Sequence, residues 1–516
     1  MSDPAAPSVS AADRREALVR RVLDRIERIG NLLPHPATLF ILLCVAMVAA
    51  SWILHVVGVQ VVHPATGKLV GATNLLSADG LRRLVLGLLP NFVNFAPLGP
   101  VLVCLLGLAI AESSGLLGAC LRLVVQATPR ALLTWVVVWC GAMSHTAGDI
   151  GYVLLLPMSM ALFLAIGRHP LAGLAAAFSG VSGGFAANLL ISTSDVVLAG
   201  FTQEAARLID KTYTVNAMAN YYFLGASVFL ITVLGALVTE RIVEPRLGTY
   251  DGEMKPEPLQ PLAPAERRGL RWALAVFLGL AALVGAGLMP GGVLQDAAKP
   301  GFINSYVIRG LVFFIFVFGL FPALAYGLAA GTIRRDTDVY KGMQKTMELA
   351  APYLVVVFFI AQFVNLFAWS NVGVIVAVKG AAVLKSLQLG PVPLMVGLVL
   401  LTAATDIFLG SASAKWAILA PVFVPMFMLL GYTPEVTQAA YRIGDSVMNV
   451  VTPLASNFPL VLMFAQRCLP RTGIGTMVAL MLPYSVAFFF GWTLLLLLWM
   501  WLGWPLGPGS VLFLRP

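Results

Sequence analysis

Long runs of apolar residues follow one another along almost the whole chain, from Pro36–Val57 near its start to Gly491–Trp501 near its end. A helix of roughly 20 apolar residues crosses the hydrocarbon layer of a bilayer, and between about nine and thirteen runs approach this length. The runs are apolar on all sides, as in Leu394–Leu401, whereas the strands of a membrane β-barrel alternate between apolar and polar residues. The pattern therefore predicts an all-α membrane protein.

Polar stretches divide these runs into two halves. We expect an N-terminal arm over residues 1–34, a first transmembrane half over 35–239, a linker over 240–271 and a second transmembrane half over 272–516. Arginines are frequent in the arm and in the linker, and basic residues flank transmembrane helices mainly on the cytoplasmic side. Both segments are therefore expected to be cytoplasmic. No short apolar core with a cleavage site precedes the first run, so we expect no removable signal peptide.

Two segments, one in each half, resemble each other when Gly151–Leu198 is placed over Lys415–Leu462 without a gap. Glycines and prolines decide this alignment, because aliphatic matches arise easily by chance between apolar segments. The matched pairs are Pro157 with Pro421, Gly167 with Gly431, Pro170 with Pro434, and Gly180 with Gly444. Paired and interrupted apolar segments in two halves are typical of secondary transporters whose substrate site lies near the middle of the bilayer.

Each repeated segment is predicted to combine a re-entrant hairpin with a broken helix. The hairpins are expected at about 130–165 and about 392–430, and the broken helices at about 171–200 and about 436–466. Pro157, Pro421 and Pro434 are the candidate hinges. The alternative is that such prolines only kink the helices that contain them.

Charged residues are rare in the apolar runs and collect in the repeated segments. A charged side chain at the centre of a transmembrane helix costs at least ~2.5–3.5 kcal/mol, so such residues usually face a cavity or a partner. In the first half they are Asp149, which lies near His145, and Asp195. In the second half they are Asp406, Lys415, Arg442 and Asp445, accompanied by Ser411, Ser413, Trp416, Asn449 and Thr452.

The side chains of this group suit an amphipathic anion and a small cation. Arg442 presents a planar set of donors that fits a carboxylate, and interrupted helices offer free N–H groups for the same purpose. Trp416 offers a flat face to an aromatic ring. Asp406, Asn449 and Thr452 carry hard oxygen ligands of the kind that a small cation or a proton prefers.

Other interpretations of the same residues stay open. Arg442 and Asp445 are three positions apart and could neutralise each other on one helix. Trp416 could belong to the aromatic belt at the membrane surface. Asp195 could be a solvated residue at a helix end, because the polar stretch that begins at Thr202 lies close by.

Composition excludes several other classes of function. The chain is 59% hydrophobic and only 11% charged, which fits lipid surroundings. Its formal net charge of +9 is explained by basic flanks of transmembrane helices, so we expect no nucleic-acid partner. The cysteines are scattered without the spacing of a zinc site, and the chain contains no HExxH motif. We therefore expect neither a cofactor nor catalytic residues.

Four stretches of the chain closely resemble the aminobenzoyl-glutamate transporter (AbgT) family. They are GRHPLAGLAAAFSGVSGGFAANLLIS (Gly167–Ser192), TERIVEPRLG (Thr239–Gly248), GSASAKWAILAPVFVPM (Gly410–Met426) and YRIGDSVMNVVTPL (Tyr441–Leu454). The resemblance extends over nearly the entire chain. It implies a homodimer in which each protomer has about nine transmembrane helices and two re-entrant hairpins, arranged as inverted repeats.

The resemblance also implies a function and a set of site residues. Members of this family are associated with ion-coupled transport of p-aminobenzoyl-glutamate, a folate breakdown product, across the bacterial inner membrane, and in some cases with export of sulfonamide antimetabolites. The family's functional positions fall on Asp195, Ser413, Trp416, Pro434, Arg442, Asp445 and Pro453. Asp406 and Asn449 correspond to positions of a sodium site.

Two residues depart from the family's usual pattern. Asp406 stands where asparagine is more usual, and His145 stands where a small polar residue is more usual. An additional carboxylate favours a proton or changes the charge balance of the site. The coupling cation is therefore expected to be Na+ or H+, held by Asp406, Asn449 and Asp445.

These observations lead to the hypothesis of a secondary transporter that works by alternating access. Arg442 and a helix terminus would bind a carboxylate of the substrate while Trp416 packs on its aromatic ring. The alternatives are a transporter of another small carboxylate, a channel, and an intramembrane aspartyl protease. The protease is disfavoured because Tyr441 is followed by Arg442 rather than by an aspartate.

Overall fold

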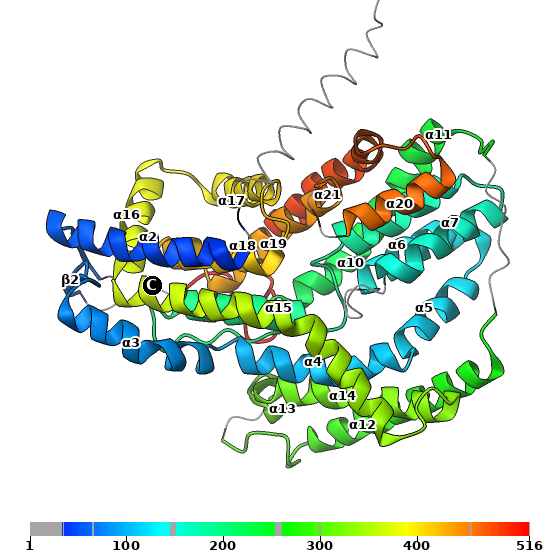
Figure 1. Ribbon diagram of the computed structural model, residues 1–516, viewed down its shortest axis with the longest axis horizontal. Helices are drawn as coiled ribbons and strands as arrows, with labels where there is room; N and C mark the ends of the chain where they lie inside the picture. The colour runs from blue at the N-terminus through cyan, green and yellow to red at the C-terminus, as the bar shows by residue number, and fades with distance from the viewer. Residues whose placement is uncertain are drawn as a thin grey trace, which may run out of the picture.

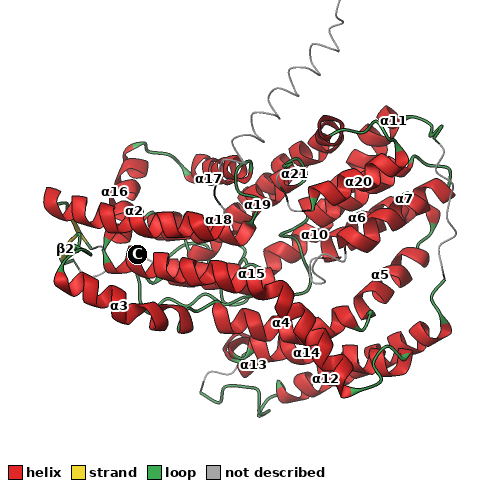
Figure 2. Ribbon diagram, viewed as in Figure 1, coloured by secondary structure: helices red, strands yellow, loops and turns green. Residues whose placement is uncertain are grey.

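The computed structural model describes residues 34, 36–63, 67–144, 151–252, 261–298, 301–453, 455 and 457–514. These residues are predominantly helical (Figure 2), and their strands β1 (Gln60–Val62) and β2 (Leu69–Gly71) pair as a small antiparallel sheet. Within this part of the chain, eight helices are long and apolar enough to cross a membrane. The number is nine if Leu116–Gln126 and Arg130–Met143, which meet at a bend of 116°, form one broken span. The predicted all-α membrane fold is confirmed.

The first half of the chain supplies short as well as membrane-length helices. They are α2 (Pro36–Val57), α3 (Ala78–Val93), α4 (Leu98–Ser113), α5 (Leu116–Gln126), η1 (Arg130–Leu132), α6 (Leu133–Met143), η3 (Gly151–Leu155), α7 (Leu156–Ala165), α8 (Pro170–Phe178), η4 (Ser179–Gly183), α9 (Thr193–Ala206) and α10 (Tyr221–Val238). His145 and Asp149 lie outside the described residues, as do residues 1–33 of the expected N-terminal arm.

The second half supplies a corresponding set. Its helices are η5 (Thr239–Val243), α11 (Glu244–Leu247), α12 (Pro264–Gly287), η6 (Phe302–Asn304), α13 (Tyr306–Arg309), α14 (Leu311–Ala330), α15 (Asp336–Trp369), α16 (Val372–Ser386), α17 (Pro391–Asp406), α18 (Ala412–Leu429), α19 (Pro434–Asn449), α20 (Phe458–Cys468) and α21 (Ile474–Leu502). Helix continues to Leu247 and resumes at Pro264, so the connection between the halves is shorter than the linker expected over 240–271.

The helices pack in two groups that differ in what they bury. Helix α2 lies beside the long helix α15, and α12, α14 and α4 pack together (Figure 1). These helices leave large apolar side chains exposed, among them Val45, Leu283, Phe313 and Val355. Such exposed apolar surface fits contact with acyl chains rather than with water. Helices α8 and α19 are instead buried along nearly their whole length.

The two repeated segments fold into the same succession of elements. Helix α7 ends at Ala165 and α18 ends at Leu429, which are equivalent positions in the alignment of the repeats. The next helices, α8 and α19, begin at the equivalent residues Pro170 and Pro434. Each is followed by a break and then by α9 or α20. The proline is tolerated at these starts because the first N–H of a helix has no partner within the helix.

Equivalent glycines form the turns between the helices of each repeat. Gly167 has φ 78° and Gly431 has φ 91°, a left-handed conformation that glycine adopts without steric cost. In both turns the residue after the glycine donates its N–H to the carbonyl oxygen of a phenylalanine, with N–O distances of 2.8 Å for Arg168 to Phe163 and 3.0 Å for Tyr432 to Phe427. The glycine matches in the sequence therefore reflect a shared backbone geometry.

A second pair of equivalent glycines brings helices into close contact. A Cβ atom added to Gly180 would lie 2.3 Å from the carbonyl oxygen of Val138 on α6. A Cβ atom added to Gly444 would lie 2.4 Å from the carbonyl oxygen of Val399 on α17. Each broken helix is thus held against the first helix of its hairpin at a distance that only glycine permits.

The hinge candidates occupy three different settings. Pro157 lies in the first turn of α7, Pro421 lies inside α18, and Pro434 is the first residue of α19. Helix α18 continues past Pro421 to Leu429, so this proline does not end the helix. Their role in motion stays a prediction.

Candidate functional site

The two repeats are joined by a buried ion pair between Asp195 and Arg442. Asp195 lies in the first turn of α9, and Arg442 lies in the middle of α19. Arg442 Nη1 donates to Asp195 Oδ1 at 2.6 Å, and both side chains are 3% exposed. Asp195 is therefore not a solvated helix-end residue. It accepts a hydrogen bond from Arg442, the donor that was expected to bind a substrate carboxylate.

The other carboxylate oxygen of Asp195 accepts hydrogen bonds from residues that precede helix α9. Asp195 Oδ2 accepts hydrogen bonds from Asn188 Nδ2 at 3.0 Å, from Ser192 N at 2.7 Å and from Ser192 Oγ at 2.8 Å. This is a capping box, in which the third residue of a helix bonds back to the residue that caps it. The arrangement fixes the beginning of α9 next to the break of the first repeat.

Trp416 is fully buried and its ring is already stacked. The ring centroids of Trp416 and Tyr441 are 4.3 Å apart with an interplanar angle of 29°. Trp416 Nε1 donates to Thr202 Oγ1 at 2.9 Å and to the Leu198 carbonyl at 3.3 Å. Trp416 is thus not a residue of an interfacial belt. In this conformation one face of its ring is covered by Tyr441 rather than open to a substrate ring.

Gln438 links the tryptophan to the ion pair. With its amide oriented so that nitrogen donates to Thr202 Oγ1 at 2.7 Å, its oxygen accepts from Arg442 Nε and Nη2, both at 3.3 Å. Thr202 in turn donates to the Leu198 carbonyl at 2.8 Å. All members of this network are buried, so each polar group needs the partner that it has. Sequence reasoning missed Thr202 and Gln438 because neither carries a charge.

A second buried ionic cluster lies one helical turn away along α19. Lys415 Nζ contacts Asp406 Oδ1 and lies 2.6 Å from Asp445 Oδ1, and its side chain is fully buried. Asp406 ends α17, Lys415 lies in the first turns of α18, and Asp445 lies on α19. The three helices of the second repeat are therefore tied together by one ammonium group. Arg442 and Asp445 do not neutralise each other, because each has a partner elsewhere.

The predicted cation ligands are close together in this cluster. Asp406 Oδ2 accepts from Thr452 Oγ1 at 3.3 Å, and Asp445 Oδ2 accepts from Asn449 Nδ2 at 3.4 Å. Tyr441 OH lies 3.4 Å from Asp445 Oδ1 and donates to the Ala412 carbonyl at 2.5 Å. Sequence reasoning placed Lys415 among the charged residues but gave it no role. The sequence did indicate that Lys415 has a buried partner, since a lysine inside an apolar run requires one.

A cavity of about 600 Å³ lies between the two repeats and helices α4 and α15. Its lining combines hydroxyl groups and apolar side chains with one carboxylate, that of Glu112. The lining residues are Val101, Leu105, Glu112, Phe185, Thr193, Ser194, Val197, Leu198, Thr346, Ala350, Tyr353, Gly410, Ser411, Ala412 and Ser413. The volume falls within the roughly 300–1,000 Å³ of small-molecule sites.

Two helices begin at this cavity. Thr193 and Ser194 are the first residues of α9, and Ser411 caps the start of α18, where Ala412 and Ser413 follow. Ser411 Oγ lies 3.3 Å from Ser413 Oγ. The first N–H groups of a helix lack partners within it and carry a partial positive charge. The cavity therefore presents two sets of donors suited to anionic groups.

The cavity reaches only one of the predicted substrate-binding side chains directly. Ser413 lines it, whereas Asp195, Trp416, Arg442 and Asp445 lie behind the lining, where they hold α9, α18 and α19 together. Pro453 lies in the break between α19 and α20, is partly buried and does not line the cavity. Asp195 and Trp416 lie on helices that border the cavity, α9 and α18, and the wall there is formed by the starts of these helices.

Tyr353 on α15 is a lining residue that sequence reasoning missed. Its hydroxyl is buried and has no hydrogen-bond partner among the described residues. A buried hydroxyl without a partner costs free energy, and this one belongs to a residue that forms part of the cavity wall. The residue lies in an apolar helix, far from the repeats in the sequence. No pattern in the sequence therefore indicated a role for it.

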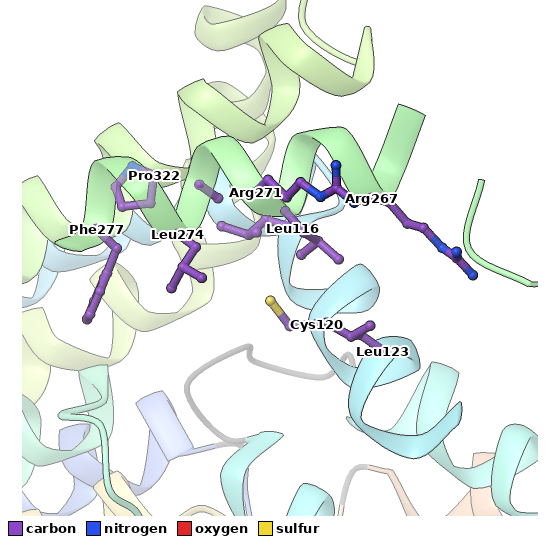
Figure 3. Close-up of a pocket in the computed structure, with 10 residues that line it drawn as sticks. Leu116, Cys120, Leu123, Arg267, Arg271, Leu274, Phe277 and Pro322 are labelled. Atoms are coloured by element: carbon purple, nitrogen blue, oxygen red, sulfur yellow. The ribbon is translucent and has the colours of Figure 1, made fainter. Parts of the chain in front are cut away.

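A second cavity, of about 560 Å³, opens between α5, α12 and α14 (Figure 3). Leu116, Leu123, Leu274 and Phe277 line it from both sides, and Arg267 and Arg271 from α12 are its charged residues. None of the described residues of the repeated segments lines it. Its lining offers neither the hydroxyl groups nor the helix starts of the first cavity, which is therefore the better candidate for a substrate site.

Comparison with known proteins places this architecture among transporters. The model of the AbgT putative transporter family matches residues 21–514. The chain is 41% identical over 485 residues to the p-aminobenzoyl-glutamate transport protein of Escherichia coli (strain K12), and the match covers 94% of this chain and 95% of that protein.

Two solved structures are similar over nearly their whole length. The Alcanivorax borkumensis YdaH transporter is 43% identical with a TM-score of 0.88, and the match covers 92% of this chain and 100% of that chain. Neisseria gonorrhoeae MtrF, described as illuminating a class of antimetabolite efflux pumps, is 44% identical with a TM-score of 0.90 and coverages of 95% and 100%.

Proposed function

The chain belongs to the AbgT putative transporter family, and from this we propose that it carries p-aminobenzoyl-glutamate or a related aromatic dicarboxylate across the bacterial inner membrane. It is a multi-pass membrane transporter and not an enzyme. The observation that carries the choice of substrate is the cavity at which α9 and α18 both begin.

The carboxylates of the substrate are assigned to the two helix starts. A glutamate moiety has two carboxylates, and the N–H groups at the starts of α9 and α18 supply two places that favour negative charge. Thr193, Ser194, Ser411 and Ser413 add hydroxyl donors beside them. Donors at half-helix starts near the middle of a repeat structure are a common way for transporters to bind anions.

The aromatic part of the substrate is assigned to the apolar wall. Phe185, Val197, Leu198, Val101 and Leu105 form apolar surface in the same cavity. An aromatic ring gains free energy from burial against such side chains and from edge or offset contact with another ring. In this proposal Trp416 acts from behind the wall, by holding α18 against α9 through Thr202, rather than by stacking on the substrate.

The two ionic clusters suit an alternating-access mechanism. Asp195 and Arg442 couple the first repeat to the second, and Lys415 couples α17, α18 and α19 within the second. The repeats therefore move as connected bodies when the site changes the side to which it opens. We also propose the homodimer and the cytoplasmic N-terminus that the family resemblance and the basic residues of the arm and the linker predict.

Export of sulfonamide antimetabolites is a second candidate activity. It is supported by the 44% identity to MtrF, which belongs to a class of antimetabolite efflux pumps. A cavity with an apolar wall and anion-binding helix starts would also accept an aromatic sulfonamide anion. The direction of transport would then depend on the gradients imposed on the same site.

Counterflow in proteoliposomes tests the proposed substrate. Purified protein is reconstituted, loaded with unlabelled p-aminobenzoyl-glutamate and diluted into labelled compound, with glutamate and p-aminobenzoate as competitors. We expect saturable accumulation of label that the intact conjugate inhibits far better than either half. Failure to accumulate label with active, monodisperse protein would reject this substrate. A current much faster than carrier turnover would instead indicate a channel.

A further inference from the structure

The Lys415 ammonium group occupies the place at which the sequence predicts a bound cation. It contacts Asp406 Oδ1 and lies 2.6 Å from Asp445 Oδ1. The side chains of Lys415 and Asp406 are fully buried, and that of Asp445 is 3% exposed. The two carboxylates expected to bind Na+ thus already share one positive charge, which the chain itself supplies.

The remaining ligands expected for Na+ form hydrogen bonds within the protein. Asn449 donates its side-chain nitrogen toward Asp445, so its amide oxygen does not point at the shared carboxylate. Thr452 Oγ1 donates to the Met448 carbonyl at 2.9 Å and lies 3.3 Å from Asp406 Oδ2. Within the part of the chain that the structure describes, no group of three or more His, Cys, Asp or Glu side chains could hold a metal ion.

Electrostatics opposes a second cation at this position. A Na+ ion that bound both carboxylates would lie within a few ångströms of the Lys415 ammonium, and like charges at such distances repel strongly in a buried site. Displacing the ammonium would not solve the problem, because a buried lysine without a partner is itself strongly disfavoured. The residues present therefore do not fit a Na+ ion while Lys415 is charged and in place.

We propose that Lys415 is a tethered substitute for the coupling-site Na+, and that Asp406 and Asp445 consequently need no Na+ for stability or for function. The inference rests on the proposed function only in regarding this cluster as the cation site of a carrier. The presence of the Lys415 ammonium group in place of Na+ is a property of the fold. Its effect on Na+ binding can therefore be measured without any transported substrate.

The structure also separates this role from direct substrate binding. Lys415 is absent from the lining of the cavity, although Ser413, two residues earlier, lines it. Arg442, a buried cation on α19, is paired with Asp195 and does not compete for Asp406 or Asp445. The charges that face the Lys415 ammonium are thus the carboxylates on α17 and α19, with Tyr441 OH beside them.

The test compares the response of thermal unfolding to Na+ in wild-type and Lys415→Met protein. Both are purified in detergent, and the unfolding temperature is measured while NaCl replaces choline chloride at constant ionic strength. Wild-type protein is expected to unfold at the same temperature in both salts. Lys415→Met removes the ammonium but keeps an apolar chain of similar length, and it is expected to be less stable in choline and to recover stability with saturating Na+.

Matched variants distinguish loss of this lysine from loss of any positive charge. Lys385→Met removes an exposed lysine from α16 and is expected to behave as wild type in both salts. Lys415→Arg keeps the charge and is expected to stay insensitive to Na+. Binding of radioactive Na+ to Lys415→Met is expected to be at least about tenfold tighter than to wild type, because the nearby like charge is gone.

The proposal is overturned by either of two results. One is saturable stabilisation of wild-type protein by Na+, which can be measured even if Lys415→Met fails to fold. The other is a folded Lys415→Met protein whose stability and Na+ binding do not respond to Na+. Because neither readout involves p-aminobenzoyl-glutamate, a failure of the proposed substrate leaves this test intact.

Discussion

Asp195 and Arg442 stand 247 residues apart in the sequence and form a buried ion pair of 2.6 Å that joins the two repeats. The other carboxylate oxygen of Asp195 accepts hydrogen bonds from Ser192 and Asn188, and the Arg442 guanidinium group also donates to Gln438. The pair therefore fixes the position of α9 relative to α19. The start of α9 forms part of the cavity wall, together with the start of α18.

Removing one partner of this pair should destabilise the protein strongly. Arg442→Ala leaves the Asp195 carboxylate buried and unpaired, which typically costs about 3–5 kcal/mol. Thermal unfolding in detergent measures the loss. The double variant Asp195→Asn, Arg442→Gln removes both charges and is expected to lose less than Arg442→Ala alone. Arg207→Ala, which removes a half-exposed arginine from the end of α9, is the control, and an equal loss there would contradict the assignment.

Helices α19 and α17 approach each other closely at Gly444, so a larger side chain at this position should destabilise the protein. Gly444→Ala places a methyl group 2.4 Å from the Val399 carbonyl oxygen, so the helices must separate. Overpacking of this kind costs about 1–3 kcal/mol. Gly397→Ala on α17 meets no atom within 4 Å and should be neutral or slightly stabilising. Unfolding temperatures that fall equally for both variants would show that the contact is not tight.

The unpartnered Tyr353 hydroxyl predicts an effect on substrate and not on folding. Tyr353→Phe removes no hydrogen bond within the described protein, so the unfolding temperature should stay near that of wild type. If the hydroxyl bonds to the substrate, KM should rise about three- to tenfold, the equivalent of one hydrogen bond. Tyr340→Phe changes an exposed tyrosine of the same helix and serves as the control. An unchanged KM would remove Tyr353 from the site.

Two ion pairs of different exposure should contribute very differently to stability. Arg168 binds Glu244 through two hydrogen bonds of 2.7 and 2.6 Å and also donates to Thr134 Oγ1 at 2.8 Å. Arg168→Ala is expected to cost about 2–3 kcal/mol, because hydrogen bonds to charged groups are strong and the pair is partly buried. Arg82→Ala breaks an exposed pair with Asp79 and should cost less than about 1 kcal/mol. Denaturation of both variants in one detergent checks the ranking.

Much of the fold could be predicted, because local backbone conformations require particular residue types that are visible in the sequence. Gly167 and Gly431 occupy left-handed turns, and Pro170 and Pro434 begin helices, so the same residue types recur at the same points of both repeats. Apolar runs predicted the membrane helices for an equally local reason. The extent of the linker was less accurate, because helix continues through Arg241 and Arg246 despite their charge.

The buried charged residues could be recognised in the sequence, but their partners could not. A buried charge reveals that it needs a partner, whereas the partner's identity depends on contacts between distant segments. The sequence suggested two partners for Arg442, the nearby Asp445 and a carboxylate of the substrate. In the structure Arg442 binds Asp195 instead. Asp445 in turn binds Lys415, and the ring of Trp416 packs on Tyr441. None of these choices follows from spacing along one helix.

The full extent of the cavity was not predictable, because the stretches that resemble the family supply only part of its wall. Its wall takes residues from α4 and α15 as well as from the starts of α9 and α18. Tyr353 lies in ordinary apolar surroundings in the sequence, and Phe185 lies in a stretch that resembles the family but has no assigned role there. Only their positions in space distinguish them from the aromatic residues that face lipid.

A structure of the protein with p-aminobenzoyl-glutamate bound tests the central claim most directly. The account predicts that the glutamate carboxylates lie at the starts of α9 and α18, near Ser194 and Ser413, and that the aromatic ring lies against Phe185 and Leu198. Substrate density in the second cavity, between α5 and α12, would contradict it.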